Sequence, residues 1–271
     1  MRIALVGHGK MGAALLQQWR SLKAHQFWVI APRFAEASAA ASVVPPLQAS
    51  ERLAFLPEPP GIADCRFDLV VMAVKPQLMD MVAPAYAARL APGGLLASIA
   101  AGCSIARLHS LFGAAPVVRI MPNLPAAIGA GVSGLCADDR ATAAQRDAIT
   151  ALMAAAGTTL WLDNEDQLDR FTAVAGSGPG YIFEIARAYA SAAESLGFPP
   201  EQARSLTLST MAGAIAMAQA ERSSLAELRT SVTSRNGTTA AGLAALNADG
   251  GLSARLTATL DAAYRRAIAL R

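Results

Sequence analysis

Histidine and cysteine are scarce in this chain of 271 residues, which contains three of each. The histidines (His8, His25 and His109) do not cluster, which argues against a metal site and leaves few candidates for a general base. The cysteines (Cys65, Cys103 and Cys136) are widely spaced with no C-x-x-C pair, which disfavours a disulfide framework and a zinc site. We expect them to be small buried hydrophobic side chains.

Long apolar runs and runs of one charge are also absent. Hydrophobic residues make up 54% of the chain, but no stretch approaches the roughly 18 apolar residues of a membrane span. The first apolar run, residues 3–6, is shorter than the roughly 7 residues of a signal-peptide core, so a cytoplasmic protein without a membrane partner is expected. The net charge of +3 is modest and the arginines are scattered, which gives nucleic-acid binding little support.

What the chain does contain, near its start, is a dinucleotide-binding fingerprint. A strand-like run leads into Gly7-His8-Gly9-Lys10-Met11-Gly12, and a helix-like stretch follows over residues 13–19. The first glycine permits a tight turn, the second lets a pyrophosphate approach the backbone, and the third lets helix and strand pack closely. The helix N-terminus presents unpaired N–H groups to the anion. A glycine-rich turn that binds nothing is the alternative.

The end of the second expected strand, residues 27–31, indicates which nucleotide is bound. A site selective for NAD normally places Asp or Glu about 20 residues past the glycines, where it binds the ribose 2′-hydroxyl. Here Pro32 and Arg33 follow the strand, and the first carboxylate is Glu36. Because a guanidinium pairs well with a 2′-phosphate, NADP(H) is predicted, with NAD(H) as a second cofactor left open. A solvated loop cation is the alternative for Arg33.

The length suits two domains, and the pattern changes near residue 165. Strand-like runs at 67–74, 95–99, 117–121 and 158–162 alternate with helical patterns, which predicts a Rossmann domain with a doubly wound, mostly parallel sheet over residues 1–164. Residues 165–271 are predicted to be all helical, with helices at 181–196, 200–220, 225–232, 239–247 and 252–270. The proline-rich stretch 44–61 is interpreted as irregular surface structure with one short helix around 49–56.

The helices of the second domain are rich in alanine and have narrow apolar stripes. Such helices pack closely but bury little area each, and a unit of this size is expected to share its core with a partner subunit. We therefore predict at least a homodimer through residues 165–271. Burial of the same stripes within a monomer is the alternative.

Three further segments end expected strands of the first domain. Ala73-Val74-Lys75-Pro76 lies at the carboxyl edge of the sheet, where such folds bind ligands. Ala100-Ala101-Gly102 supplies small residues that suit close backbone approach to a flat ring. Asn123 stands between two prolines, where its amide can orient a ligand, although a turn-forming Asn is the commoner explanation.

A fourth segment, residues 232–239, joins two expected helices. It contains Ser234, Gly237, Thr238 and Thr239 and opens a helix. A hydroxyl-rich loop at a helix N-terminus is suited to bind an anion and to form hydrogen bonds. One threonine as a simple N-cap is the alternative, but two threonines exceed what capping needs.

Together with the segment AGSGPGYIF at 175–183, these motifs resemble the pyrroline-5-carboxylate reductase family along essentially the whole chain. The resemblance implies NAD(P)H-dependent reduction of 1-pyrroline-5-carboxylate to L-proline, the last step of proline biosynthesis. It implies a Rossmann domain followed by a helical domain that interlocks in homodimers, with a decamer of dimers as a larger assembly.

The resemblance also implies roles for residues. The glycine loop, Pro32, Arg33, residues 73–76 and residues 100–102 are expected to bind the cofactor. Asn123, Ser234, Gly237, Thr238 and Thr239 are expected to bind the substrate, with the carboxylate on the N–H groups of Gly237 and Thr238. Thr239 is expected to be catalytic, through a hydrogen bond to the imine nitrogen of a substrate that faces the nicotinamide from the same subunit or its partner.

Several positions depart from the family pattern. Lys10 stands where Asn is usual, Leu124 where Thr is usual, and Gly180 where Ala is usual. Arg235-Asn236 replaces a common Pro-Gly, and Ser224-Leu225 replaces a usual His-Pro. A reductase of a related cyclic imine and a non-catalytic NADP-binding regulator remain alternatives. A β-hydroxyacid dehydrogenase is disfavoured, because it needs a catalytic lysine and residues 166–271 contain none.

Overall fold

The computed structural model describes residues 1–35, 50–61 and 65–271. The chain forms two compact units, of which the first contains Met1–Ser177 together with Ala263–Arg271 and the second contains Gly178–Ala262. The chain therefore passes from one unit to the other twice, after Ser177 and after Ala262. In the ranges that the structure describes, no helix has both the length and the apolar character needed to cross a membrane.

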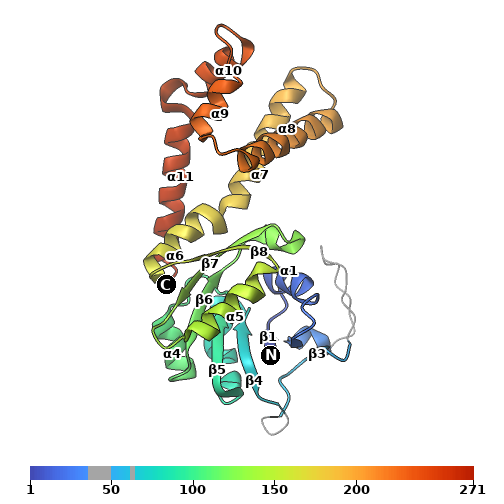
Figure 1. Ribbon diagram of the computed structural model, residues 1–271, viewed down its shortest axis with the longest axis vertical. Coiled ribbons are helices and arrows are strands. Elements are labelled where there is room, and N and C mark those ends of the chain that lie inside the picture. Colours follow the sequence, from blue (N-terminus) through green and yellow to red (C-terminus); the bar gives the residue numbers. More distant parts are fainter. Residues whose placement is uncertain (36–49, 62–64) are drawn as a thin grey trace. The chain divides into compact units, whose positions relative to one another are not determined.

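An eight-stranded sheet forms the centre of the first unit (Figure 1). The strand order is β3-β2-β1-β4-β5-β6-β7-β8, and neighbouring strands are parallel except for the pair β6 and β7. The predicted doubly wound, mostly parallel sheet is thereby confirmed. The strands are β1 Arg2–Val6, β2 Gln26–Ile30, β3 Leu53–Leu56, β4 Phe67–Met72, β5 Leu90–Ser98, β6 Val117–Met121, β7 Gly131–Ala137 and β8 Gly157–Trp161.

The central strands are apolar because both faces of the sheet are covered. On one face, Leu15, Leu16 and Trp19 of α1 (Lys10–Trp19) pack with Ile149 and Leu152 of α5 (Ala143–Ala154). On the other face, a second cluster contains side chains from α4 (Ile105–Phe112) and from the two single-turn helices α2 (Met79–Val82) and α3 (Pro84–Ala87). Two separate cores therefore hold the sheet in place from both sides.

Two strands are not predicted by the sequence pattern. The predicted short helix around 49–56 is wrong over the part that is described, because residues 53–56 form the edge strand β3, which pairs in parallel with β2. Ala49 and two of the prolines, Pro45 and Pro46, lie outside the described residues. Residues 131–137 form β7, which runs antiparallel to β6. Its sequence, GVSGLCA, has few of the β-branched residues that indicate strands.

Short helical segments complete the first unit. They are the 3₁₀ turns η1 Pro32–Ala35, η2 Pro76–Leu78 and η3 Leu124–Ile128, the helix α6 Glu165–Phe171 and the π-helical turn η4 Thr172–Gly176. The first crossing between the units follows this π-helical turn directly. Single π-helical turns are rare and are often found near functional sites.

The second unit is helical, as predicted. Proline at the start of α8 and Ser224 at the N-cap of α9 set the first residues of these helices in the manner expected from their capping preferences. The helices are α7 Gly178–Ser195, α8 Pro200–Ala220, α9 Leu225–Ser231, α10 Thr238–Leu246, the 3₁₀ turn η5 Ala248–Gly250 and α11 Gly251–Ile268, whose last turns belong to the first unit.

Candidate functional site

The glycine loop connects β1 to α1 at the carboxyl edge of the sheet. Gly7 has a φ of 98° and donates its N–H to Ile30 O at 2.8 Å. A Cβ on Gly7 would lie 2.6 Å from the carbonyl oxygen of Ala73, and one on Gly12 would lie 2.7 Å from the carbonyl oxygen of Gly7. Because such distances are shorter than any real Cβ contact, glycine is required at both positions for the turn and the helix to pack against the strand ends.

Gly9 differs from the other two glycines of the loop. It is the N-cap of α1 with φ −74° and ψ −174°, and a Cβ there would meet no atom within 4 Å. No side chain of the described residues caps α1, and its first turn contains no acidic residue. The first N–H groups of α1 therefore face an open space that suits a pyrophosphate, and the loop fits a dinucleotide on geometry as well as on sequence.

Replacement of Gly9 by alanine tests whether the space in front of α1 is needed for cofactor binding and not for folding. Alanine adopts the backbone angles of Gly9 without strain, so the variant should unfold at the temperature of the parent. Its methyl group fills the space in front of α1, and the affinity for NADPH, measured by fluorescence titration, should fall about tenfold. Gly180→Ala is the control, since a Cβ there also meets nothing within 4 Å. Equal affinity in Gly9→Ala would place the dinucleotide elsewhere.

Pro32 and Arg33 stand at the end of β2, beside the glycine loop. Both are exposed, and they begin the turn η1. The guanidinium of Arg33 contacts Nδ1 of His8 and lies over the ring of Phe34, with Cζ 5.4 Å from the ring centroid. The predicted cation is therefore at the edge of the glycine loop, where the 2′ position of a bound adenosine ribose is expected.

The segments after β4 and β5 lie at the same edge of the sheet. Ala73 N–H donates to Val6 O at 2.7 Å, and Ile99 N–H donates to Met72 O at 3.0 Å, so the three strand ends are joined by hydrogen bonds. Lys75 is exposed in extended backbone, and Pro76 begins the turn η2. The structure thus gathers the predicted cofactor residues of positions 7–12, 32–33, 73–76 and 100–102 along one edge.

The segment Ala100-Ala101-Gly102 is tightly enclosed. Gly102 has a φ of 70°, and a Cβ there would lie 2.7 Å from the carbonyl carbon of Leu270. The next residue, Cys103, is fully buried, and burial raises the pKa of its thiol. Cys103 therefore acts as a small apolar side chain of the core next to this segment and is unsuited to react as a thiolate. Cys136 is buried in the same way, as predicted, whereas Cys65, for which the same prediction was made, is only partly buried.

Asn123 has a different environment from the one expected for a ligand-binding side chain. It is only 6% exposed. Its Nδ2 donates to Ala175 O at 3.0 Å, and its Oδ1 accepts from Val132 N–H at 2.9 Å. Both ends of the amide are thus bonded to backbone, and Asn123 links the end of β6 to β7 and to the π-helical turn.

The loop before α10 has a conformation that its sequence permits. Asn236 is left-handed, with a φ of 59°, although Gly is common in the family at this place. Gly237 is the N-cap of α10, so neither Thr238 nor Thr239 serves as the cap. No side chain in the described ranges caps this helix, and Ser234, Thr238 and Thr239 are exposed. The loop belongs to the second unit, whereas the cofactor residues and Asn123 belong to the first.

An ion pair that sequence reasoning missed lies close to the Ala100-Ala101-Gly102 segment. Arg119 of β6 is 2% exposed, and its Nη1 donates to Glu165 Oε1 at 2.6 Å. The same oxygen accepts the N–H of Ile105 at 2.9 Å, at the start of α4. The one available signal was a charge within the apolar strand VVRIM, but its partner is 46 residues away in sequence.

A second group of missed contacts involves the last residues of the chain. The hydroxyl of Tyr264 donates to Asp166 Oδ1 at 2.5 Å, and the ring of Tyr264 lies under Arg170. Arg271 Nε donates to Asp169 Oδ2 at 2.5 Å. These contacts fasten residues 263–271 to α6 and bring Leu270 against Gly102.

Comparisons with known proteins agree with this arrangement. Residues 165–270 match the family model described as pyrroline-5-carboxylate reductase dimerisation, which supports oligomerisation, and residues 2–102 match the model described as NADP oxidoreductase, coenzyme F420-dependent. Among solved structures, a pyrroline-5-carboxylate reductase from Coxiella burnetii has a TM-score of 0.84 at 30% identity over 99% of this chain and 97% of that one. The Plasmodium falciparum enzyme with NADP bound has the same fold, with a TM-score of 0.83 at 22% identity over 100% of this chain and 98% of that one.

The curated relatives extend the agreement in sequence. A pyrroline-5-carboxylate reductase from Pseudomonas aeruginosa is 45% identical over 211 residues, which are 78% of this chain and 76% of that protein. One from Haemophilus influenzae is 38% identical over 67% of this chain and 68% of that protein. With sequence identity of this extent and a match to the family's dimerisation region, the chain belongs to the pyrroline-5-carboxylate reductase family.

Proposed function

We propose that this chain reduces 1-pyrroline-5-carboxylate to L-proline with NADPH as the hydride donor. Membership of the family supports the reaction. For this chain, the proposal is carried by two helix N-termini that no side chain of the described residues caps. They are the start of α1, after the glycine loop, and the start of α10, at Gly237. The first suits a pyrophosphate and the second suits a carboxylate, which are the anionic groups of this cofactor and this substrate.

The cofactor site is proposed from the first unit. The N–H groups at the start of α1 hold the pyrophosphate, with Lys10 adding positive charge, and Arg33 beside Pro32 pairs with the 2′-phosphate. Residues 73–76 and 100–102 line the nicotinamide end. When bound, the dihydronicotinamide supplies the hydride. NADH lacks the 2′-phosphate, and we expect it to be the weaker donor.

The substrate site is proposed from the loop before α10. The N–H groups of Gly237 and Thr238 hold the carboxylate, with Ser234 as a further donor, and the hydroxyl of Thr239 hydrogen-bonds the imine nitrogen. Hydride addition at C5 places an electron pair on that nitrogen, which takes a proton from solvent to give the amine of proline. Because the imine is already electrophilic, orientation and polarisation suffice, which is consistent with the few histidines.

The direct test is the initial rate of NADPH oxidation by the purified protein with 1-pyrroline-5-carboxylate, with NADH in parallel and proline identified as the product. Turnover that favours NADPH supports the proposal. If NADPH binds and no proline forms, the substrate differs, and related cyclic imines are assayed next. If no imine is reduced, the chain is an NADP-binding regulator instead of an enzyme.

Arg33→Ala tests the cofactor preference. Hydrogen bonds to a charged group contribute about 1.5–3 kcal/mol each, so the KM for NADPH should rise about tenfold or more. The KM for NADH should change little, because NADH has no 2′-phosphate for Arg33 to contact. Arg20→Ala, which removes an exposed arginine just after α1, is the control. A parallel rise in both KM values would assign Arg33 a general role in the fold and not a role at the 2′-phosphate.

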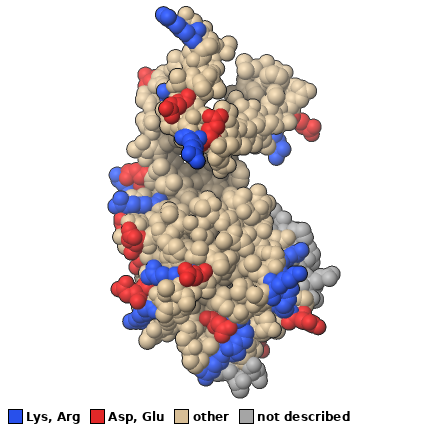
Figure 2. Space-filling view, in the orientation of Figure 1, with Lys and Arg blue, Asp and Glu red and all other residues tan. Residues whose placement is uncertain are grey.

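We also propose that the protein is a homodimer built through residues 165–271, of the kind that can assemble further into a decamer of dimers, and that it is cytoplasmic. Figure 2 shows large uncharged areas over α7 and α8. Large apolar side chains of these helices are exposed, among them Ile182, Phe183, Tyr189, Leu206 and Ile215. Exposed apolar area on this scale is typical of a protein interface.

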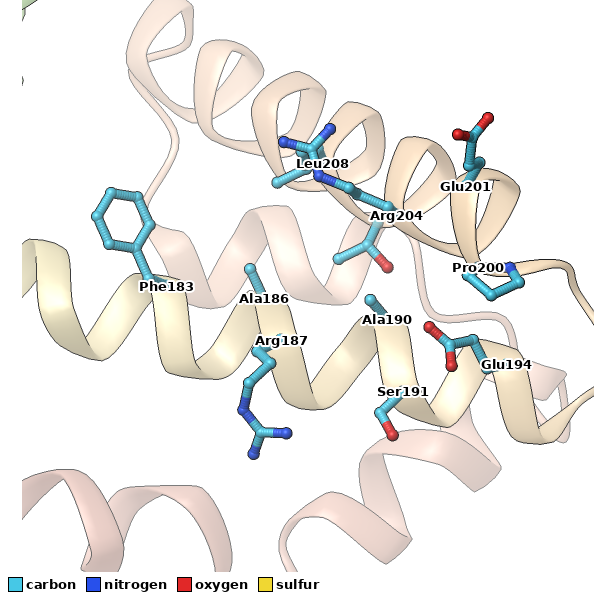
Figure 3. Close-up of a pocket in the computed structure, with 11 residues that line it drawn as sticks. Phe183, Ala186, Arg187, Ala190, Ser191, Glu194, Pro200, Glu201, Arg204 and Leu208 are labelled. Carbon is cyan, nitrogen blue, oxygen red and sulfur yellow. The ribbon is translucent and has the colours of Figure 1, made fainter. Parts of the chain in front are cut away.

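A groove between α7 and α8 is part of this proposed interface. It has a volume of about 750 Å³. Figure 3 shows Phe183, Ala186 and Ala190 pointing from α7 toward α8, while Arg187 points to the opposite side of α7. Thr207 of α8 is 2% exposed, and its hydroxyl finds no partner among the described residues. We assign the groove to apolar side chains of the second copy.

Phe183→Glu should weaken the dimer. Phe183 is 65% exposed in the single chain, and truncation of an aromatic anchor in an interface costs about 2 kcal/mol or more, which is about a 30-fold weaker dimer. Light scattering during size-exclusion chromatography across protein concentrations measures the change. Met81→Glu introduces the same charge at a residue of the first unit that is 72% exposed, and it serves as the control. An unchanged mass for Phe183→Glu at every concentration would contradict the interface.

A further inference from the structure

The ring of His8 occupies a specific position between the glycine loop and the end of β2. It lies 5.5 Å from the ring of Phe34 and 6.0 Å from the ring of Phe55, centroid to centroid, and these two phenylalanines are 5.1 Å apart. Its Nδ1 contacts the guanidinium of Arg33. The imidazole is therefore held by two aromatic rings and directed at the cation that is proposed to bind the 2′-phosphate.

The guanidinium beside Nδ1 indicates which tautomer the neutral ring adopts. A guanidinium only donates hydrogen bonds, so Nδ1 of His8 accepts and the proton of the neutral imidazole is on Nε2. Nε2 is buried and has no hydrogen-bond partner in the described part of the chain. Within the described ranges, neutral His8 thus has one hydrogen bond, through an atom that becomes a donor when the ring takes up a proton.

Among the residues that the structure describes, the charged groups of the segments around His8 are mostly cations. Arg33 on η1 contacts the ring directly. Lys10 at the start of α1 and Lys75 after β4 belong to neighbouring segments and are exposed. The element that supplies Phe55, β3, contains no charged residue, and Glu58 follows it two residues later as an exposed side chain. A dianion that binds against Arg33 would therefore reverse the sign of the charge that faces the imidazole.

We propose that His8 takes up a proton from solvent when the 2′-phosphate of NADPH binds beside Arg33, so that the preference for NADPH over NADH rises as pH falls. Histidine is the side chain that changes charge between about pH 5 and 8, and a neighbouring anion favours its charged form. On binding, Nδ1 changes from an acceptor for Arg33 to a donor for a phosphate oxygen. Arg33 keeps its charge and turns the same N–H groups to the phosphate.

The sign of the pH dependence follows from proton uptake. Below the pH at which unbound His8 titrates, the ring is already charged and the affinity for the 2′-phosphate is at its maximum. As pH rises through and above that value, binding must include protonation, and the affinity falls by up to about tenfold per pH unit. NADH lacks the 2′-phosphate, so its binding should not depend on His8 in this way. The ratio of the two affinities therefore reports on His8.

This inference rests on the proposed use of NADPH and does not depend on the imine substrate. Its test uses adenosine 2′,5′-bisphosphate and adenosine 5′-monophosphate, which differ only in the 2′-phosphate. Isothermal calorimetry at about pH 7.5 in two buffers of different ionisation enthalpy counts the protons bound with each ligand. A phosphate monoester ionises a second time near pH 6, so the free ligand is already mostly dianionic at this pH.

The parent protein should take up a substantial fraction of one proton with the bisphosphate and almost none with the monophosphate. His8→Asn keeps an acceptor near the position of Nδ1 but cannot be protonated, and it should lose the uptake and the pH dependence of the bisphosphate affinity. His25→Asn, which removes a histidine at the other end of β2, should keep both. Affinity for the monophosphate reports in each variant that the rest of the site is intact.

The outcomes are separable. Tight binding of the bisphosphate without proton uptake by the parent protein, or equal uptake in His8→Asn, overturns the role of His8 and leaves the cofactor proposal standing. Failure of the bisphosphate to bind the parent protein overturns the cofactor site and the role of His8 together.

Discussion

Thr239→Ala is expected to lower kcat for 1-pyrroline-5-carboxylate about 100-fold, which is the usual cost of removing one donor that acts on the developing charge. The side chain of Thr239 is exposed in the first turn of α10, and the N-cap of this helix is Gly237 and not a threonine. Its hydroxyl is therefore not required for capping and is available to the imine nitrogen. Because the cofactor residues belong to the other unit, the Kd for NADPH should be unchanged.

Two further variants separate the hydroxyl from packing. Thr239→Ser keeps the hydroxyl and should recover most of the lost turnover. Thr257→Ala removes a threonine of α11 whose hydroxyl donates to Ser253 O at 2.9 Å within its own helix, and turnover should match the parent. Steady-state rates with proline quantified, together with NADPH titration, make the comparison. Turnover of Thr239→Ala within about twofold of the parent would remove this hydroxyl from the mechanism.

The cofactor edge is largely predictable because its determinants are local in sequence. Gly7, Gly9 and Gly12 act through the turn that contains them, and Arg33 follows the next strand directly. In a parallel sheet, the ends of successive strands meet at one edge, so the strand pattern alone assigns residues 73–76 and 100–102 to that edge. The conformation of Asn236 is also accessible from sequence, since Asn is the non-glycine residue that tolerates a left-handed backbone best.

The remaining features depend on partners that are distant in sequence. The motif around Asn123 predicts a substrate contact, but nothing nearby shows that Ala175 and Val132 bond both ends of its amide. Periodicity predicts the segment 252–270 as one helix of the second domain, yet its last residues pack in the first unit through contacts about 100 residues apart in sequence. Periodicity identifies a helix and does not specify what its end contacts.

The ion pair between buried Arg119 and partly buried Glu165 leads to the second large effect. The carboxylate joins three elements, because Glu165 begins α6 and its Oε1 accepts from Arg119 of β6 and from Ile105 N–H of α4. Removing one partner of a buried pair leaves an unpaired charge in a medium that solvates it poorly, whereas replacing both partners with apolar residues is often neutral. Glu165 is the more informative residue to replace, because its loss leaves the guanidinium of Arg119, which is 2% exposed, without its ion-pair partner.

Glu165→Ala should lower the free energy of unfolding by about 3 kcal/mol or more, measured by urea denaturation of the purified protein. The double variant Arg119→Met/Glu165→Leu should regain at least half of the loss, because no buried charge remains. Glu184→Ala breaks a pair with Arg187 in which both side chains are about two-thirds exposed (63% and 68%), and stability should hardly change. A small loss of stability in Glu165→Ala would mean that water or another carboxylate already solvates Arg119. A double variant less stable than the single one would contradict the argument that the unpaired charge causes the loss. Recovery of stability in the double variant would mean that Glu165 mainly neutralises the charge that Arg119 places in β6. No recovery would mean that the ion pair itself stabilises this part of the first unit.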